Sequence, residues 1–279
     1  MLRVLLRLFA SLPLPLIHGL GTIFGYIYFL LFRRRLRRTR RNLRWIRTSL
    51  SKRDYRQLMH ASIRETGKGI LETFAIWFRP QESVVKLVKD CHGWEHVEAA
   101  RAKGNGIVFL TPHLGCYEIT AIYYATHYPI SVLFKPPRNA KLAELVSDGR
   151  QRSQITLAPT NLSGIRTLLK TLKRGDAVGI LPDQVPEENE GEWADFFGRP
   201  AYTMTLVSKL VESTGATVLL AFGERLKSGD GYVIHIEPLY PEGTPAKAPS
   251  PQDVNLGIER LVRQCPEQYL WSYGRFKQP

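Results

Sequence analysis

Two histidines in this chain stand five residues before a glutamate. His113 and Glu118 lie in "TPHLGCYE", and His60 and Glu65 lie in "HASIRE". A carboxylate that holds one imidazole nitrogen leaves the other nitrogen free to take a proton from an attacking hydroxyl, so either pair has the groups for general base catalysis. With seven histidines and 25 acidic residues present, one such match arises by chance about as often as not. The surrounding elements must therefore distinguish the two pairs.

His60 and Glu65 lie within a continuous helical pattern of apolar residues. Five residues along a helix correspond to about 140° of rotation, so these two side chains should diverge. His113 lies between Pro112 and Gly115, which predicts a turn from a strand into a helix, with Glu118 in the first helical turn. Such a turn can fold the imidazole back toward the carboxylate. A loop histidine followed by a capping glutamate is the alternative that these residues leave open.

Alternating strand and helix patterns follow a helical region at 54–103. The sequence predicts strands at 106–111, 130–134, 155–159, 177–182 and 217–225, helices at 119–128, 140–152, 164–174 (capped by Ser163), 203–214 and 253–264, and a hairpin from 217–225 into 232–239. This order indicates an α/β fold with a mostly parallel central sheet flanked by helices. The composition, 44% hydrophobic and 23% charged, agrees with a folded core.

Polar residues follow two of the predicted strands. His113 follows "IVFLTP", and Asp183 with Gln184 follows "AVGILP". In parallel sheets, ligands bind beyond the carboxyl ends of the strands. We therefore expect these side chains to meet at one edge of the sheet.

The amino-terminal segment predicts a membrane anchor. Residues 8–32 contain no Asp, Glu, Lys or Arg, and nine arginines follow within residues 33–47. This length is sufficient to span a bilayer, and a basic cluster beside it is typical of the cytoplasmic side. Pro13 and Pro15 with three glycines leave open a segment that lies in the membrane interface. The predicted organisation is an anchor at 1–32, a basic juxtamembrane segment at 33–53 and an α/β catalytic domain at 54–279.

The charge and the cysteines restrict the partners and the compartment. A net charge of +14 favours an anionic partner, and the arginines beside an apolar segment favour membrane lipids over nucleic acid. Three widely separated cysteines give no disulfide framework, which fits a reducing compartment. "CHGWEH" at 91–96 has no second ligand cluster, so we interpret it as a loop that leads into a helix and predict no metal.

Several stretches in order carry a family resemblance. "TPHLGCYE" resembles the H-x4-[D/E] motif of the lysophospholipid acyltransferase-like superfamily. With "LFKPPRN", "LLKTLKRGDAVGILPDQ", "FFGRPAYTMT" and "YLWSYGRFK", the chain resembles the late lauroyl/myristoyl acyltransferases of lipid A biosynthesis over nearly its whole length. Gly274 departs from the pattern, since the family tends to have a basic residue there. This departure puts phosphate binding by the tail in doubt.

The resemblance implies acyl transfer from acyl carrier protein to a hydroxyl of a lipid A precursor at the cytoplasmic face of the inner membrane, without a cofactor or an acyl-enzyme. It implies His113 as the general base and Glu118 as its orienting partner. The implied substrate-binding candidates are Arg150, Lys135, Arg138, Asp183 and Gln184. Cys116 is expected to pack rather than react. Three alternatives remain at this stage: another lipid acceptor, an acyl coenzyme A donor, and a non-catalytic membrane protein.

Overall fold

The computed structural model describes residues 2–46, 50–137, 139–152, 154–241 and 247–279. Its main helices are α1 (Leu2–Ala10), α2 (Leu14–Leu31), α3 (Arg33–Leu43), α4 (Lys52–Phe78), α5 (Gln81–Val85), α6 (Trp94–Ala102), α7 (Tyr117–Tyr124), α8 (Ala140–Arg150), α9 (Leu162–Lys173), α10 (Leu206–Thr214) and α11 (Pro251–Gln264). Its strands are β1 (Val88–His92), β2 (Ile107–Leu110), β3 (Ile130–Phe134), β4 (Ile155–Pro159), β5 (Ala177–Ile180), β6 (Gly191–Phe196), β7 (Arg199–Met204), β8 (Thr217–Arg225) and β9 (Tyr232–Pro238).

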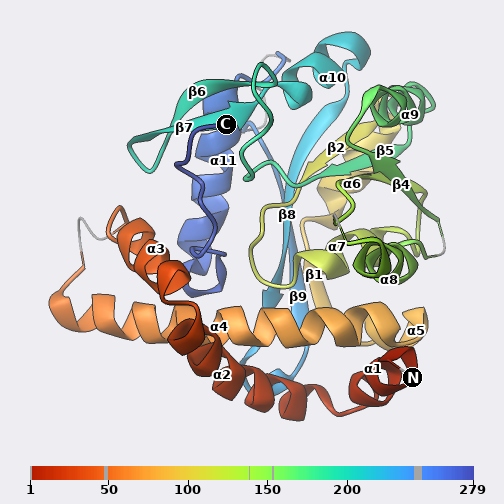
Figure 1. Cartoon of the computed structure of the whole chain (residues 1–279). Helices are drawn as coiled ribbons and strands as arrows, with labels where there is room; N and C mark the ends of the chain where they lie inside the picture. The colour runs from red at the N-terminus through yellow and green to blue at the C-terminus, as the bar shows by residue number, and fades with distance from the viewer. Residues whose placement is uncertain (1, 47–49, 138, 153, 242–246) are drawn as a thin grey trace.

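The expected α/β fold with a mostly parallel sheet is confirmed (Figure 1). Seven strands lie in the order β1-β9-β8-β2-β5-β3-β4, and every neighbouring pair is parallel except the β8–β9 hairpin. β6 and β7 form a separate antiparallel pair beside α11. The buried strands are short apolar runs, as expected where helices cover both faces of a sheet.

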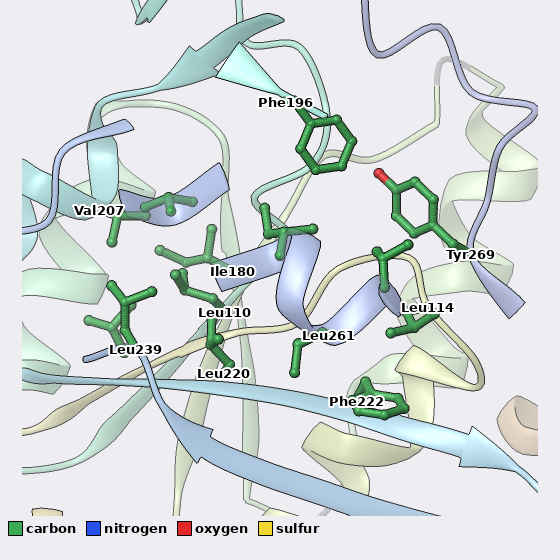
Figure 2. Close-up of a cluster of buried hydrophobic side chains, with 14 of the residues drawn as sticks. Leu110, Leu114, Ile180, Phe196, Val207, Leu220, Phe222, Leu239, Leu261 and Tyr269 are labelled. Atoms are coloured by element: carbon green, nitrogen blue, oxygen red, sulfur yellow. The ribbon is translucent and has the colours of Figure 1, made fainter. Parts of the chain in front are cut away.

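Successive residues of each central strand alternate between two apolar layers. In β2, Val108 and Leu110 pack in the layer with α9, α10 and α11, whereas Ile107 and Phe109 pack in the layer with α6 and α7. Figure 2 shows the first of these layers around α11, and it includes Leu114 from the predicted catalytic turn. The turn is therefore fixed to the core by its own apolar side chain.

The amino-terminal helices lie across one end of the sheet. α4 extends past the carboxyl ends of the parallel strands, and α2 packs along α4 on the side away from the sheet (Figure 1). Glycines allow this close approach: a Cβ on Gly67 would lie 2.0 Å from the carbonyl oxygen of Gly21 and 2.4 Å from the nitrogen of Gly25. α2 is the one described helix long and apolar enough to cross a membrane, and a third of its apolar window is buried inside the protein.

Three details differ from the predictions, two because of strand pairing and one because of helix capping. Part of the predicted helical region is β1, whose backbone pairs with β9, so "CHGWEH" starts in a strand rather than a loop. The start of the helix predicted at 203–214 is occupied by β7, which pairs with β6. The amino-terminal cap of α9 is Asn161 rather than Ser163, because the Asn161 side chain accepts a hydrogen bond from the nitrogen of Gly164.

Candidate active site

The strand register brings the two polar turns together. β2 and β5 are parallel neighbours in which Leu110 pairs with Ile180. His113 and Asp183 each come three residues after these paired positions. The backbone N–H of Thr111 donates to the carbonyl oxygen of Ile180 at 2.9 Å, which keeps the two chains adjacent beyond the sheet. The predicted meeting of these side chains at one sheet edge is confirmed.

Asp183 holds His113 through two hydrogen bonds. Its Oδ1 lies 2.9 Å from His113 Nδ1, and its Oδ2 accepts from the His113 backbone N–H at 3.0 Å. The Tyr269 hydroxyl also bonds to this carboxylate. Burial opposes the charged form, but the interactions with His113 and the charge of Arg275 outweigh it and lower the pKa of Asp183. An ionised Asp183 therefore fixes the imidazole ring in place.

The second ring nitrogen of His113 has the properties that a base requires. With Nδ1 donating to Asp183, Nε2 carries the lone pair, and the amide nitrogen of Gln184 lies 3.1 Å from it. The side chain of Gln184 is exposed, so an incoming hydroxyl can replace its amide at Nε2. The Tyr117 ring packs against the imidazole at 4.7 Å between centroids.

Glu118 occupies the expected first turn of α7, but its carboxylate faces Arg150 instead of His113. Arg150 Nε lies 3.1 Å from Oε1 and 3.0 Å from Oε2, and its Nη2 also bonds to Oε1. Although burial lowers the pKa of Arg150, Glu118 and Tyr117 raise it by more, and the Tyr117 hydroxyl bonds to the guanidinium. His113 is therefore not hydrogen-bonded to Glu118 as expected, because each group has a different partner.

The turn that carries His113 is bonded to two other parts of the chain. The N–H of Gly115 donates to the carbonyl of Gln268 at 3.1 Å, the N–H of Cys116 donates to Gly223 at 2.7 Å, and the N–H of Leu270 donates to His113 at 3.0 Å. Gly115 has a φ of 60°, and a Cβ there would lie 2.0 Å from the Gly223 oxygen. Only glycine fits this position.

A mostly apolar cavity has Tyr117, Glu118 and Arg150 among its lining residues. Its volume is about 50 Å³, within about 770 Å³ of space between atoms that includes open solvent. Its walls come from α7 and from the strands of the sheet, and they include Trp94, Phe109, Tyr124, Ile130, Ile155 and Gly179. A narrow apolar space beside a base suits a substrate with a hydrocarbon chain.

The other residues considered in the sequence analysis are Lys135, Arg138 and Cys116. Lys135 forms a 2.7 Å ion pair with Glu187 on the surface, and this lowers the pKa of Glu187. Arg138 lies outside the described residues. Cys116 is buried, which raises the pKa of its thiol, so it stays protonated at neutral pH as a packing residue does. Among the described residues, no group of three or more His, Cys, Asp or Glu is arranged to hold a metal ion.

The second His–Glu pair behaves as its helical position predicts. His60 Nδ1 lies 3.3 Å from the Tyr26 hydroxyl, whereas Glu65 bonds to Lys68 at 2.6 Å and to Arg225 at 2.7 Å. The two side chains therefore have separate partners. Geometry leaves His113 as the candidate base.

Sequence reasoning missed three contributors to the site. Asp183 was expected at the sheet edge, but not as the direct partner of His113. Each of these residues comes three positions after the end of its strand, and this equal spacing is the signal that could have indicated their contact. Tyr117 and Tyr269 have no spacing that would identify them. They contact the site through the α7 turn and the carboxyl-terminal segment.

Comparison with known proteins gives the family. A family model described as bacterial lipid A biosynthesis acyltransferase matches residues 2–278. The chain belongs to this family. It is 26% identical to the lipid A biosynthesis lauroyltransferase of Escherichia coli K12 over 276 residues, which is 98% of this chain and 89% of that protein.

Two further members of the family from the same organism show how far the similarity extends. Identity to the lipid A biosynthesis palmitoleoyltransferase is 27% over 277 residues, or 98% of this chain and 88% of that protein. Identity to the lipid A biosynthesis myristoyltransferase is 25% over 186 residues, or 65% of this chain and 57% of that protein. Membership of the lipid A acyltransferase family supports an acyltransferase activity for this chain, and the expected family resemblance is confirmed.

Proposed function

We propose that this protein transfers a fatty acyl group from the thioester of acyl carrier protein to a hydroxyl of a lipid A precursor. The observation that carries the proposal is His113, held by Asp183 beside an apolar cavity, in a chain that the lipid A acyltransferase family covers almost completely. The positive net charge of +14 supports an acidic donor protein and a phosphorylated acceptor. The reaction takes place at the cytoplasmic face of the inner membrane, to which the amino-terminal helices attach the enzyme.

In the proposed reaction the acceptor hydroxyl replaces the Gln184 amide at His113 Nε2. As the hydroxyl oxygen attacks the thioester carbonyl carbon, its proton passes to Nε2. The tetrahedral intermediate then collapses, the carbon–sulfur bond breaks, and the thiolate leaves and takes the proton from His113. Asp183 stabilises the transient imidazolium, because it is ionised and bonded to Nδ1.

We assign Glu118 and Arg150, which both line the cavity, a positioning role. Their ion pair is mostly buried, with 8% of the Glu118 side chain and 20% of the Arg150 side chain exposed. The pair holds the Tyr117 hydroxyl, and Tyr117 separates the imidazole from the cavity. The acyl chain of the donor would enter the cavity past this group. Lys135 and Arg138 remain candidates for contact with an anionic substrate group.

The test is to compare His113→Ala with His60→Ala, since both histidines precede a glutamate by five residues. Acyl transfer to lipid A is measured with acyl carrier protein and coenzyme A thioesters, and lipid A mass spectra are recorded for a deletion strain that carries each variant. We expect the rate of acyl transfer to fall by about 10²- to 10⁴-fold in His113→Ala and to stay unchanged in His60→Ala. Near-normal transfer by a folded His113→Ala protein would refute the base assignment, and an unchanged lipid A spectrum on deletion would refute the acceptor.

A further inference from the structure

The largest exposed apolar surface belongs to α1 and α2. Eleven of the fourteen large apolar side chains exposed among the described residues lie between positions 4 and 32. In α2 they are Leu16, Leu20, Ile23, Tyr26, Ile27, Leu30 and Leu31. At 100° per residue, all of these except Tyr26 fall within about 60° of Leu16 around the helix, so they form one continuous stripe. A soluble protein surface rarely carries such a patch without a partner.

The opposite face of α2 is joined to the catalytic domain. Gly21 and Gly25 touch the backbone of α4, so closely that a Cβ on Gly25 would lie 2.3 Å from the Ile63 oxygen. His18, which is 3% exposed, places Nε2 at 2.9 Å from Glu72 of α4. The same Glu72 carboxylate bonds to Arg225 at the end of β8. α2 is thus an integral part of the fold along its length.

These contacts determine how α2 can meet a bilayer. A helix that crossed the hydrocarbon core would carry its neighbour α4 with it. α4 contains charged side chains at its amino-terminal end and in its middle, among them Arg53, Asp54, Arg64 and Glu65, and its opposite side faces the sheet. Because charged groups are excluded from the hydrocarbon core, α4 must remain outside it. α2 must then lie parallel to the membrane surface.

The charges beside the stripe complement a lipid headgroup layer. Directly after Phe32, α3 and its cap present seven exposed arginines: Arg33, Arg34, Arg35, Arg37, Arg40, Arg41 and Arg44. Arg7 is exposed on α1. An apolar stripe with a basic segment beside it is the pattern of a helix that rests in the interface of an anionic membrane.

We propose that α1 and α2 form a monotopic anchor, immersed in one leaflet with the Leu16–Leu31 stripe toward the lipid tails and the α3 arginines among anionic headgroups. This deepens the membrane attachment in the proposed function. The carboxyl ends of β2, β5 and β8 face α4, so the candidate site lies on the side of the sheet that is nearest the membrane. The chain terminus ahead of α1 stays on the same side of the membrane as the catalytic domain.

The sidedness is tested with two proteins that each carry one added, accessible cysteine in a Cys91→Ala background, since the remaining Cys116 and Cys265 are buried. One carries a short polar tag with a cysteine ahead of Met1, and the other carries Lys277→Cys at the exposed end of the chain. An impermeant maleimide is applied to right-side-out and to inverted membrane vesicles. We expect both cysteines to react in inverted vesicles only. Reaction of the tag in right-side-out vesicles, opposite to Lys277→Cys, would show a spanning α2 and overturn the proposal.

The lipid-facing stripe is tested with Ile23→Lys/Ile27→Lys and a matched control, Leu256→Lys, which alters an exposed leucine on α11. Binding to phosphatidylglycerol-containing vesicles should fall about tenfold or more in the double variant and stay unchanged in the control. Equal binding by both variants would overturn the proposal, as would a loss of self-association in the double variant without a change in vesicle binding. Acyl transfer to detergent-dispersed acceptor should survive in the double variant. This separates failure of the anchor from failure of the proposed chemistry.

Discussion

The contact between Asp183 and His113 leads to a quantitative prediction for Asp183→Asn. The carboxylate accepts hydrogen bonds from both Nδ1 and the backbone N–H of His113, at 2.9 Å and 3.0 Å. An asparagine of the same shape offers one acceptor and one donor, so one of these two bonds is lost. The negative charge opposite the imidazolium is lost as well.

The size of the effect follows from the contact that is removed. A hydrogen bond that involves a charged group contributes about 1.5–3 kcal/mol, and about 1.4 kcal/mol corresponds to a tenfold change in rate. We therefore expect kcat to fall by about 10- to 150-fold. If the amide also reverses the imidazole tautomer, the loss approaches the full contribution of a general base, about 10²- to 10⁴-fold.

The assay is acyl transfer from acyl carrier protein to a lipid A precursor in detergent, with circular dichroism to verify folding. The informative comparison is the double variant His113→Ala/Asp183→Asn. Because Asp183 acts through His113, the double variant should be no slower than His113→Ala alone. Wild-type kcat in Asp183→Asn, or full additivity in the double variant, would refute the reasoning.

Glu118→Gln is the matched control for that experiment, because it changes the carboxylate that contacts Arg150 rather than His113. Its expected effect is mainly a higher KM for the acyl donor, since Glu118 lines the cavity. A selective loss of kcat in Glu118→Gln, with Asp183→Asn unaffected, would restore Glu118 as the partner of the base.

Further predictions concern stability and chain-length preference. Glu72→Ala leaves the buried Arg225 without its main partner and should destabilise the fold by about 3–5 kcal/mol in urea unfolding, whereas a loss below about 1 kcal/mol would contradict the pairing. Burial raises the pKa of Glu72, but Arg225 and His18 lower it by more, to about 2. Because the pKa is lower in the folded state, ionised Glu72 stabilises the fold above its unfolded value near 4.5, and this stabilisation is lost as the pH falls toward 2. The urea midpoint should therefore fall more steeply with acid in wild type than in Glu72→Gln. Gly67→Ala should lower Tm, because its Cβ would meet the Gly21 oxygen at 2.0 Å, whereas Gly19→Ala, with nothing within 4 Å, should not. Gly179→Val should fill part of the cavity and shift kcat/KM toward shorter acyl donors, at about 0.8 kcal/mol or roughly fourfold for each methylene excluded; an unchanged ranking of donors would exclude this cavity as the acyl site.

The core of the fold was predictable because its signals are local. β2, β5 and β8 are short apolar runs, and the helices between them have periodic apolar faces. β1 was missed because an exposed strand has no such run, and its backbone is stabilised by β9, which lies far along the chain. β6 and β7 were also missed, because the conformation of each is determined by pairing with the other rather than by a continuous apolar run.

The candidate site was predictable only in part. His113 was distinguished from His60 by flanking residues that fix a turn rather than a helix, and the structure agrees. The partner of His113 was not predictable from spacing, because it comes from another strand. Glu118 is near in sequence, but its carboxylate is bound by Arg150 of α8, and Asp183 reaches the imidazole through the pairing of β2 with β5.

The sequence by itself determined the family, the alternation of strands and helices, the turn that carries His113, and an apolar segment followed by arginines. Each of these is encoded in consecutive residues. Tertiary structure decided which carboxylate meets the imidazole and which face of α2 remains exposed. The reason is that both depend on contacts between distant segments: the Leu110–Ile180 register brings Asp183 to His113, and the packing of Gly21 and Gly25 on α4 turns the Leu16–Leu31 stripe outward.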